Sequence, residues 1–206
     1  MKAPNKIYLS LKEEVITGKL EAGKKVSISE LKNIYKVSLS PIREALNKIA
    51  ERGLLIHENN RGVRVASLSH EELREIIHLL FIIMPYALHS SMMNSDVALH
   101  KKIIENIHLL ELSDSLHEDK KILSAAPEII LSRCSSKWVK NISIMLFENF
   151  NRYQLASPMI KYYMPYLKRK HREFSMSFIE RDFKKAEKSM KYQILIGRRA
   201  YCNSSR

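Results

Sequence analysis

Arg43 and Asn47 are the residues whose types and spacing point most directly to chemistry in this chain of 206 residues. They lie four positions apart, so a helix would carry both side chains on one face. Leu39 falls one turn earlier on that face, and Ser38 and Ser40 flank it. A guanidinium and a side-chain amide match the hydrogen-bonding edges of guanine and adenine, and hydroxyl groups bind phosphates. This pattern therefore indicates a surface able to contact duplex DNA.

A helix that begins near Ser38 must position these residues. Ser38 can cap this helix by accepting a hydrogen bond from the backbone N–H two or three residues later. Pro41 falls in the first turn, where its missing N–H costs nothing. Ile42, Leu46 and Ile49 follow at i, i+4 and i+7 and form a stripe that faces away from Arg43. A buried stripe opposite an arginine-bearing face predicts a helix that can enter a major groove.

Two further helices are expected upstream. Residues 27–30, Ser-Ile-Ser-Glu, fit a capping box that opens a short helix through about Tyr35, and a turn follows at Lys36 and Val37. Before them, apolar residues recur every four positions, and the run stops at Gly18, a residue type that commonly ends helices. The recurring residues are Ile7, Leu11 and Val15. A short helix, a tight turn and a second helix give helix-turn-helix spacing.

Residues 54–65 have the pattern of a β-hairpin. Residues 54–57 and 63–65 are short β-prone runs, and residues 58–62 between them supply the Asn and Gly that suit a hairpin turn. Three helices followed by a hairpin make a winged helix. We therefore expect residues 1–66 to form a winged helix-turn-helix domain.

Residues 7–66 resemble the DNA-binding domain of the GntR family of bacterial transcription regulators. The shared residues are Gly18, Leu20, Gly23, Glu30, Leu31, Val37, Ser38, Pro41, Arg43, Glu44, Ala45, Leu46, Gly53, Leu54, Arg61, Gly62 and Val65. The resemblance implies that Ser38, Ser40 and Arg43 hold phosphates or base edges in the major groove. It also implies that the wing tip reaches the minor groove through Asn60, Arg61 and Gly62.

Two positions depart from the family pattern. Where the family commonly has arginines, this chain has Ser29 and Leu39. Leu39 can contact a thymine methyl group and so change the preferred operator, or it can simply weaken the affinity for DNA, and the sequence leaves both open. Some of the lost phosphate contacts can be replaced by Lys24, Lys25, Lys32 and Lys36.

The composition favours a polyanionic partner. The chain has 35 Lys and Arg against 22 Asp and Glu, a net charge of +13. Residues 1–70 contribute +6 of this charge, so the excess is not confined to the expected DNA-binding domain. A basic run at 168–172 is expected to be a solvated helix face. With only 5 glycines, no phosphate-binding loop and no nucleophile elbow, the sequence does not indicate an enzyme.

The sequence also predicts a cytoplasmic protein that associates with the nucleoid when bound to DNA. It opens with no signal sequence, and the longest apolar run, residues 79–88, contains Pro85 and is too short to span a membrane. Cys134 and Cys202 have neither metal nor redox spacing, so we expect reduced, structural thiols.

Beyond a linker at residues 67–70, residues 71–206 are expected to form an all-helical bundle, which makes the whole protein mainly α. Ser69 and Glu72 fit a cap for a helix that runs to about Met93, with a kink at Pro85. Later helices are predicted over residues 96–112, 117–134, 136–154, 158–180 and 183–200. Ser157-Pro158 and Asp182 are the expected caps of the last two.

In order and length this bundle is similar to the FCD domain of FadR-type GntR regulators. The similarity rests on His171-Arg172-Glu173 followed by the segment from Ile179 to Ala186. Many members of that group bind a divalent metal through one Asp and three His. By the resemblance, this chain has at those positions Leu123, Pro127, His171 and Gln193. One imidazole cannot supply the ligands of a metal site, so we predict no metal and no cofactor.

Three interpretations of the bundle remain open. It can hold a pocket for a hydrophobic or acyl-type effector, it can be a filled core that only dimerises, or it can offer a surface to a protein partner. The expected pocket residues are Leu80, Met84, Leu123, Pro127, Arg152, His171 and Gln193. The function we expect is a repressor that binds a palindromic operator as a homodimer. The alternative is a ligand-independent architectural protein with low sequence specificity.

Overall fold

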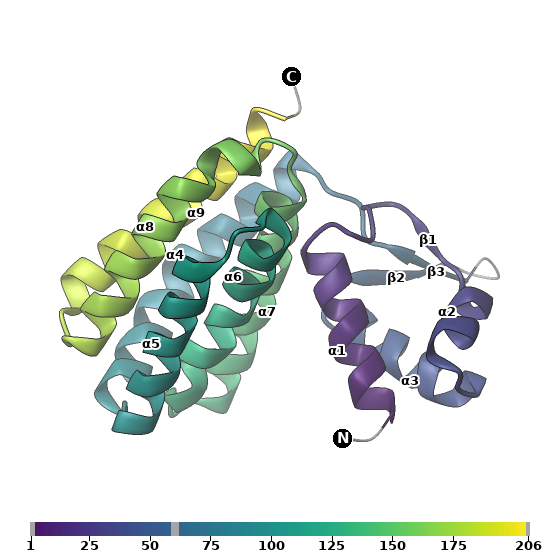
Figure 1. Cartoon of the computed structure of the whole chain (residues 1–206), viewed down its shortest axis with the longest axis horizontal. Coiled ribbons are helices and arrows are strands. Elements are labelled where there is room, and N and C mark those ends of the chain that lie inside the picture. The colour runs from purple at the N-terminus through teal and green to yellow at the C-terminus, as the bar shows by residue number, and fades with distance from the viewer. Residues whose placement is uncertain (1–2, 59–61, 205–206) are drawn as a thin grey trace. The chain divides into compact units, whose positions relative to one another are not determined.

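The structure is a computed structural model and describes residues 3–58 and 62–204 (Figure 1). The chain divides into two compact units, Met1–Ser69 and His70–Arg206, which we call the N-terminal unit and the helical bundle. This division falls inside the segment 67–70 expected to be a linker. The domain limits drawn from the sequence stay a prediction.

The N-terminal unit contains three helices and a small antiparallel sheet. Its elements are α1 (Ala3–Ile16), β1 (Lys25–Val26), α2 (Ile28–Tyr35), α3 (Leu39–Ala50), β2 (Leu55–Glu58) and β3 (Gly62–Val65). The strand order is β1-β3-β2, and β3 pairs with both neighbours. The predicted winged helix-turn-helix fold is confirmed. The two-residue strand β1 was not predicted, because two residues are too short to show alternation.

An apolar core holds this unit together. The stripe Ile7, Leu11 and Val15 of α1 is buried, and α1 packs on α3. Ile42 and Ile49 of α3 are each 0% exposed. The buried face predicted for α3 therefore exists, and packing fixes the orientation of its opposite face.

The second unit is an all-helical bundle, as the sequence predicts. Its elements are α4 (His70–Met93), α5 (Val97–Leu112), α6 (Leu116–Ile130), the 3-10 helix η1 (Leu131–Arg133), α7 (Lys137–Ala156), α8 (Ile160–Ile179) and α9 (Phe183–Cys202). Figure 1 shows α8 and α9 side by side as a helical hairpin, and these two helices contact each other extensively. The central helix α4 packs on α7 and α9.

Of the caps predicted for the last two helices, the cap of α9 is confirmed and the cap of α8 is wrong. Asp182 accepts a hydrogen bond from the backbone N–H of Lys185 at 3.0 Å and caps α9. Helix α8 instead begins at Ile160, and its N-cap residue Met159 makes no side-chain cap. The hydroxyl of Ser157 donates to the Ala200 carbonyl at 2.7 Å and accepts from the N–H of Met159 at 3.2 Å. Ser157 therefore ties the end of α7 to α9.

Helix α4 has the length and composition of a membrane-spanning helix, the one such helix among the described residues. Its buried residues, however, include Leu80, Met84, Leu88 and Met92, on a helix that packs on α7 and α9. The core helix of a bundle has the same composition, so the composition is weak evidence of a span. Pro85 lies inside α4, which continues past it.

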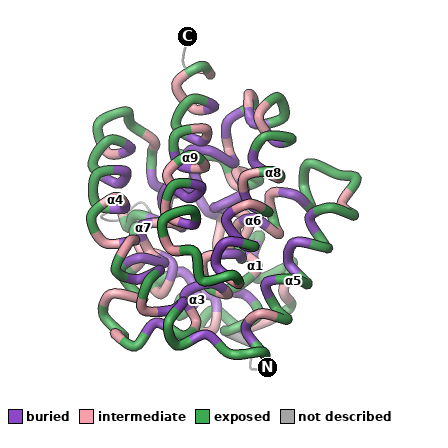
Figure 2. The backbone as a smooth tube through the Cα atoms, turned by 90° about the vertical axis from the view of Figure 1, so that its left-hand side faces the viewer, coloured by how far each residue is buried: buried purple, intermediate pink, exposed green. Residues whose placement is uncertain are grey.

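Helix α7 is buried over an unusual length. All eight residues from Glu148 to Leu155 are buried, although five of them are polar or charged. Figure 2 colours each residue by burial, and α7 carries a long buried stretch. Buried polar groups need hydrogen-bond partners, so the interior of this bundle cannot be a plain apolar core.

Candidate DNA interface and bundle cavity

Helices α2 and α3 form the helix-turn-helix. The hydroxyl of Ser27 accepts a hydrogen bond from the backbone N–H of Glu30 at 3.3 Å, which is the cap expected for α2. Lys36 ends α2 in the left-handed region, at φ 50°. This residue makes the tight turn that directs the chain into α3.

The exposed side of α3 carries the residues expected to contact DNA. Arg43 and Asn47 are exposed, and Leu39 is 41% exposed one turn earlier. Ser38 and Ser40 are exposed at the start of the same helix. The structure thus brings together on one helix the five residues that the sequence singled out there. Ser29 is exposed in the first turn of α2, where its hydroxyl lies 3.0 Å from that of Ser27.

The role expected for the Ser38 side chain as a cap is wrong. Ser38 is the N-cap residue of α3, but its side chain makes no capping hydrogen bond. The residue three positions later is Pro41, which has no N–H to donate. The Ser38 hydroxyl is therefore left available at the exposed start of the helix.

Strands β2 and β3 form the wing. They pair from Leu55 opposite Val65 to Glu58 opposite Gly62. Gly62 is exposed and has φ 95°, a conformation that favours glycine. The other two wing residues expected to reach DNA, Asn60 and Arg61, lie outside the described residues.

Arg64 stabilises the wing from within. Its Nε donates to the Glu58 carboxylate at 2.8 Å, and its guanidinium also donates to the Gly23 carbonyl. The Glu58 hydrogen bond and charge raise the pKa of Arg64. Strand β3 therefore uses this arginine to join the wing to the loop before β1.

A hollow lies between α3 and the wing. It is lined in part by Arg43 and Asn47 of α3, His57 of β2 and Gly62 of β3. His57 was not among the residues expected to contact DNA. His57 is exposed although Leu55, two residues earlier, and Val63, opposite it in β3, are both buried. Strand alternation would place His57 on the buried face with them, so it could not have found this residue. The hollow thus joins the recognition-helix face to the wing.

Lysines surround this surface. All four lysines that the sequence offered as replacement phosphate contacts are exposed: Lys24, Lys25, Lys32 and Lys36. A Cβ atom added to Gly62 would lie 3.6 Å from Cε of Lys25, so this lysine lies beside the wing. The unit therefore keeps several cations near the wing and the helix pair despite the missing arginines.

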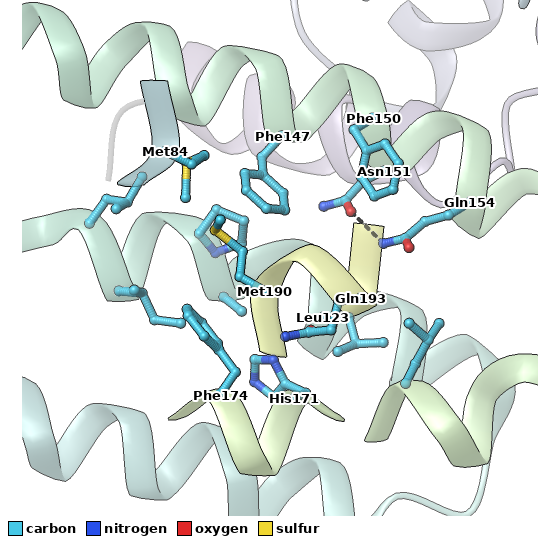
Figure 3. Close-up of a pocket in the computed structure, with 15 residues that line it drawn as sticks. Met84, Leu123, Phe147, Phe150, Asn151, Gln154, His171, Phe174, Met190 and Gln193 are labelled. Atoms are coloured by element: carbon cyan, nitrogen blue, oxygen red, sulfur yellow. Dashed lines mark hydrogen bonds between the residues drawn. The ribbon is translucent and has the colours of Figure 1, made fainter. Parts of the chain in front are cut away.

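The interior of the bundle contains a small cavity of about 50 Å³ between α4, α6, α7, α8 and α9 (Figure 3). Five of the seven residues expected to form a pocket line it: Met84, Leu123, Pro127, His171 and Gln193. The walls are mainly apolar, with Phe147, Phe150, Phe174 and Met190 among them. The cavity holds a few water molecules at most, since a water needs roughly 10–15 Å³ of such volume.

Leu80 and Arg152 do not line this cavity. Leu80 is buried one turn before Met84 on α4, and the cavity touches α4 at Met84 but not at Leu80. Arg152 is 2% exposed, and its guanidinium donates to Asn149 Oδ1 at 3.1 Å. Burial lowers the pKa of Arg152, and the charge of Glu72 on α4 opposes this effect. The α7 residues at the cavity are instead Asn151 and Gln154, which flank Arg152 and face a different direction.

These two amides carry the polar chemistry of the cavity. Gln154 Nε2 donates to Asn151 Oδ1 at 2.7 Å, and Figure 3 shows both side chains at the cavity wall. Nδ2 of Asn151 and Oε1 of Gln154 are buried without a hydrogen-bond partner. One free donor and one free acceptor therefore lie at the cavity. The sequence analysis missed both, because they fall on a helix whose polar residues gave no sign of burial.

His171 is a buried, neutral residue of the same wall. Its Nε2 lies 2.9 Å from Oδ1 of Asn106, whose Nδ2 donates to the Ile122 carbonyl at 3.3 Å. Because Asn106 uses its amide nitrogen elsewhere, His171 donates through Nε2. Burial lowers the pKa of His171 to about 4, and hydrogen bonding with Gln193 opposes this only in part. This histidine thus links α8 to α5.

No three His, Cys, Asp or Glu side chains within residues 3–58 and 62–204 lie close enough together to hold a metal ion. His171 has Asn106 and Gln193 as its polar neighbours. An imidazole with two amides is not a donor set typical of a zinc site, which needs three or four His, Cys or carboxylate ligands. The residues present at this wall therefore do not fit a metal.

Comparison with known proteins identifies the first part of the chain. Residues 4–65 match the family described as bacterial regulatory proteins, gntR family. The N-terminal unit is a GntR-family helix-turn-helix domain. The matched segment spans α1 to the end of β3 and so includes the whole surface described above.

Curated relatives extend the similarity beyond the GntR domain. The uncharacterized HTH-type transcriptional regulator BphR of Paraburkholderia xenovorans is 25% identical over 161 residues, 74% of this chain and 66% of that protein. The HTH-type transcriptional repressor GlaR of Escherichia coli is 24% identical over 154 residues, 71% of this chain and 70% of that protein. The chain thus spans about two thirds of the length of these relatives.

Solved structures share the fold of both units. McbR/YncC of E. coli superposes with a TM-score of 0.81 at 13% identity, over 100% of both chains. A GntR transcriptional regulator from Rhodococcus sp. RHA1 superposes with a TM-score of 0.77 at 14% identity, also over 100% of both chains. A helix-turn-helix unit followed by a helical bundle is therefore a fold that these two solved structures share with this chain.

Proposed function

We propose that this protein is a sequence-specific transcription regulator, a repressor, that binds a near-palindromic operator as a homodimer. The observation that carries the proposal is the exposed face of α3, where Arg43 and Asn47 adjoin the hollow beside the wing. A helix presenting a guanidinium and an amide at this spacing can read bases in the major groove. Such a protein acts in the cytoplasm, on the nucleoid.

The relatives support regulation rather than catalysis. BphR is named an HTH-type transcriptional regulator and GlaR an HTH-type transcriptional repressor. By analogy with GlaR, we propose that this protein lowers transcription by occupying a promoter.

The first test is a genome-wide selection of DNA fragments with purified protein at about 150 mM salt. We expect a symmetric motif, bound roughly a thousandfold more tightly than random duplex. Binding without any motif would favour the alternative of an architectural protein with low specificity.

The second test is Arg43→Ala, measured on the selected operator. Loss of a bidentate base contact should cost about 1 to 3 kcal/mol of binding free energy and relax the preference at one base position. Lys48→Ala is the matched control, because Lys48 is a cation of α3 that pairs with Glu44 at 2.6 Å and lies off the Arg43 face. Equal effects of the two substitutions would remove the recognition role of Arg43.

Leu39 determines the operator preference in our proposal. It is an exposed apolar side chain on the face of Arg43, where a thymine methyl group is the natural apolar contact. Leu39→Ala should lower the affinity about tenfold for an operator that has thymine at the contacted position. The affinity for an operator in which another base replaces that thymine should not change. A uniform change for both operators would mean that Leu39 only weakens binding.

The outer face of α4 is the dimer interface we propose. Leu79, Ile82, Tyr86 and Met93 are exposed there at near-helical spacing, and Ile82 is 63% exposed. A continuous apolar strip of this kind commonly marks an interface. Ile82→Glu with Tyr86→Glu should convert the dimer to a monomer in analytical ultracentrifugation. Ile104→Glu on α5, also exposed, is the control, and dissociation by that change instead would contradict the choice of α4.

We also propose that the bundle is an FCD-type domain whose metal site has degenerated. His171 alone remains of the expected ligands, with Leu123, Pro127 and Gln193 at the other positions around the cavity. The chemistry of the cavity suits a small ligand with an apolar body, one acceptor for Asn151 Nδ2 and one donor for Gln154 Oε1. The volume of about 50 Å³ is far below the roughly 300–1,000 Å³ of ordinary ligand pockets, so such an effector requires the cavity to expand.

Native mass spectrometry of the protein purified from its host tests the effector. A bound molecule that is lost in Gln154→Leu but kept in Arg152→Lys would support the cavity as its site. An unliganded protein that represses normally would instead support the filled core, in which the bundle only dimerises.

A further inference from the structure

The positive charge of the helical bundle is confined to its last two helices. Residues 70–159 contain 9 Lys and Arg against 11 Asp and Glu, a net charge of −2. Helices α8 and α9 together contain 11 Lys and Arg against 2 Glu, a net charge of +9. The excess is therefore a property of one helical hairpin and not of the bundle surface in general.

The basic run 168–172 supplies few of the hairpin's cations that lack a carboxylate partner. Lys168 pairs with Asp119 and Lys170 with Glu173, and Arg172 pairs with Glu111. Among the described cations of α8 and α9, most of those without a carboxylate partner lie on α9: Lys184, Lys185, Lys188, Arg198 and Arg199. The run that stands out in the sequence is thus largely neutralised, and the accessible charge lies on the following helix.

Exposed aromatic side chains accompany these cations. Tyr162 and Tyr166 on α8 are 60% and 56% exposed, and Tyr192 on α9 is 48% exposed. Lys161 lies 4.9 Å from the ring of Tyr162, and Arg169 lies 5.8 Å from that of Tyr166. Lys170 of α8 lies 5.3 Å from the ring of Tyr192 on α9, so the cations and tyrosines of the two helices contact each other. Figure 2 shows exposed residues along much of α9.

We propose that the α8–α9 hairpin is a second, sequence-independent DNA-binding surface, which binds the phosphates of duplex flanking the operator. The proposal rests on the proposed function, since it assigns this surface to the same polyanion. The five free cations of α9 would bind phosphates, and the tyrosines would support the neighbouring cations by contact with their rings.

The dimensions of α9 fit this partner. Lys184 and Arg199 are fifteen residues apart, which corresponds to about 22 Å along a helix. A duplex carries one phosphate charge per about 1.7 Å of its axis, so several phosphates fall within reach of such a row. Because the contacts would be to phosphates, the surface would add affinity for DNA without adding sequence preference.

The composition of the face argues against a protein partner. Protein interfaces have an apolar centre and are depleted in lysine. The large exposed apolar or aromatic side chains that lie between the α9 cations are Tyr192 and Leu195, at 48% and 42% exposure. A face with single apolar residues among many lysines and arginines is instead typical of phosphate binding.

Lysine footprinting on the full chain tests the proposal. The protein is acetylated with an N-hydroxysuccinimide ester, with and without a random 30-base-pair duplex at low salt, and each lysine is quantified by mass spectrometry. We expect DNA to protect Lys184, Lys185 and Lys188 at least threefold. The exposed control lysines on other bundle helices, Lys101, Lys102 and Lys137, should react equally in both samples.

The lysines of the N-terminal unit separate the two proposals. Protection of Lys24, Lys25, Lys32 and Lys36 without protection on α9 would overturn the second surface and leave the proposed function intact. Protection nowhere would overturn both proposals. Protection of the control lysines to the same extent as α9 would also overturn the second surface, since binding would then not be specific to the hairpin.

A pair of charge-matched variants gives an independent measurement. Lys185, Lys188 and Arg199 are changed to Gln in one variant, and Lys101, Lys102 and Lys137 in the other, so both lose three charges at exposed helix positions. For random duplex, the slope of log K against log salt should become shallower by about 2 to 3 in the first variant only. Equal slopes in the two variants would overturn the proposal.

Discussion

The two units of this protein place their polar side chains in opposite ways. Among the described residues, the buried polar side chains number one in the N-terminal unit, Thr17, and fifteen in the helical bundle. The GntR domain has an ordinary apolar core, and none of its described Arg, Asn or Ser side chains is buried. The bundle encloses Asn, Gln, His and Arg side chains between its helices.

Because of this difference, substitutions should have different consequences in the two units. A polar group on the surface is hydrated before and after a substitution, so changes to the outer face of α3 should affect DNA binding and leave stability nearly unaltered. A buried polar group is matched to its neighbours, and removing or charging it leaves a desolvated atom without a partner. Interior changes in the bundle should therefore cost several times more free energy of unfolding.

The largest effect is expected from acid acting on His171. Its pKa of about 4 in the folded protein lies below the usual 6.5, so the unfolded chain binds the proton more readily. The stabilisation is complete above pH 6.5 and is lost as the pH falls toward 4. This one group should lower the free energy of unfolding by about 3 kcal/mol over that range. Urea unfolding at pH 7.5, 5.5 and 4.0 measures it.

Two variants isolate the histidine from the carboxylates that titrate in the same range. His171→Gln removes the titrating group, so its stability should fall less between pH 7.5 and 4.0 than that of the natural protein. His78→Gln replaces an exposed histidine on α4 and should keep the natural pH dependence. If His171→Gln were to show the same pH dependence as His78→Gln, burial of a neutral His171 would be refuted.

A large change is also expected at Gly197, where α9 approaches α7 closely. A Cβ atom at this position would lie 2.7 Å from Cζ of Phe150 and 2.9 Å from Cβ of Gln154. Gly197→Val should therefore lower the free energy of unfolding by about 1 to 3 kcal/mol, through overpacking of the cavity wall. Ala98→Val, at an exposed position of α5, controls for the cost of a β-branched residue in a helix. Equal urea midpoints for the two variants would show that α7 and α9 can separate without cost.

The same contrast explains what the sequence could predict. In the GntR domain, information lies in caps, turn residues and an amphipathic α3, which are local features, so the helices, the wing and the α3 face were all predicted. The errors there were also local. Pro41 removes the N–H that a Ser38 cap needs, and β1 is too short to have a pattern.

In the bundle, helix positions were predictable but the interior was not. Asn151 and Gln154 lie in a segment of α7, residues 148–155, that is buried on all sides. Burial of a whole segment depends on where four other helices pack. A polar residue on such a helix looks like a surface residue in sequence. The resemblance to a known family pointed to His171 and Gln193, which line the cavity. Arg152, which was expected in the pocket without support from that resemblance, lies next to Asn151 but does not line the cavity.

Within the N-terminal unit, the largest stability effect of a surface change is expected at Ser27. Its hydroxyl satisfies the N–H of Glu30 at the start of α2. Ser27→Ala should lower the free energy of unfolding by about 1 kcal/mol, the usual cost of removing an N-cap. Ser29→Ala, two residues later and exposed, is the control and should change stability by less than about 0.5 kcal/mol.

The smallest effect on stability is expected at Ser38, although it is the N-cap residue of the helix that we propose to enter the major groove. Its side chain makes no capping bond, so Ser38→Ala should change the free energy of unfolding by less than about 0.5 kcal/mol. A hydroxyl that does not serve the fold remains available to a phosphate, and the same substitution should weaken operator binding several-fold. A loss of about 1 kcal/mol in stability, as for Ser27, would instead mean that Ser38 caps α3 in solution. Urea unfolding and operator titration of this variant, run beside Ser27→Ala, therefore test whether a cap position in this domain serves folding or DNA.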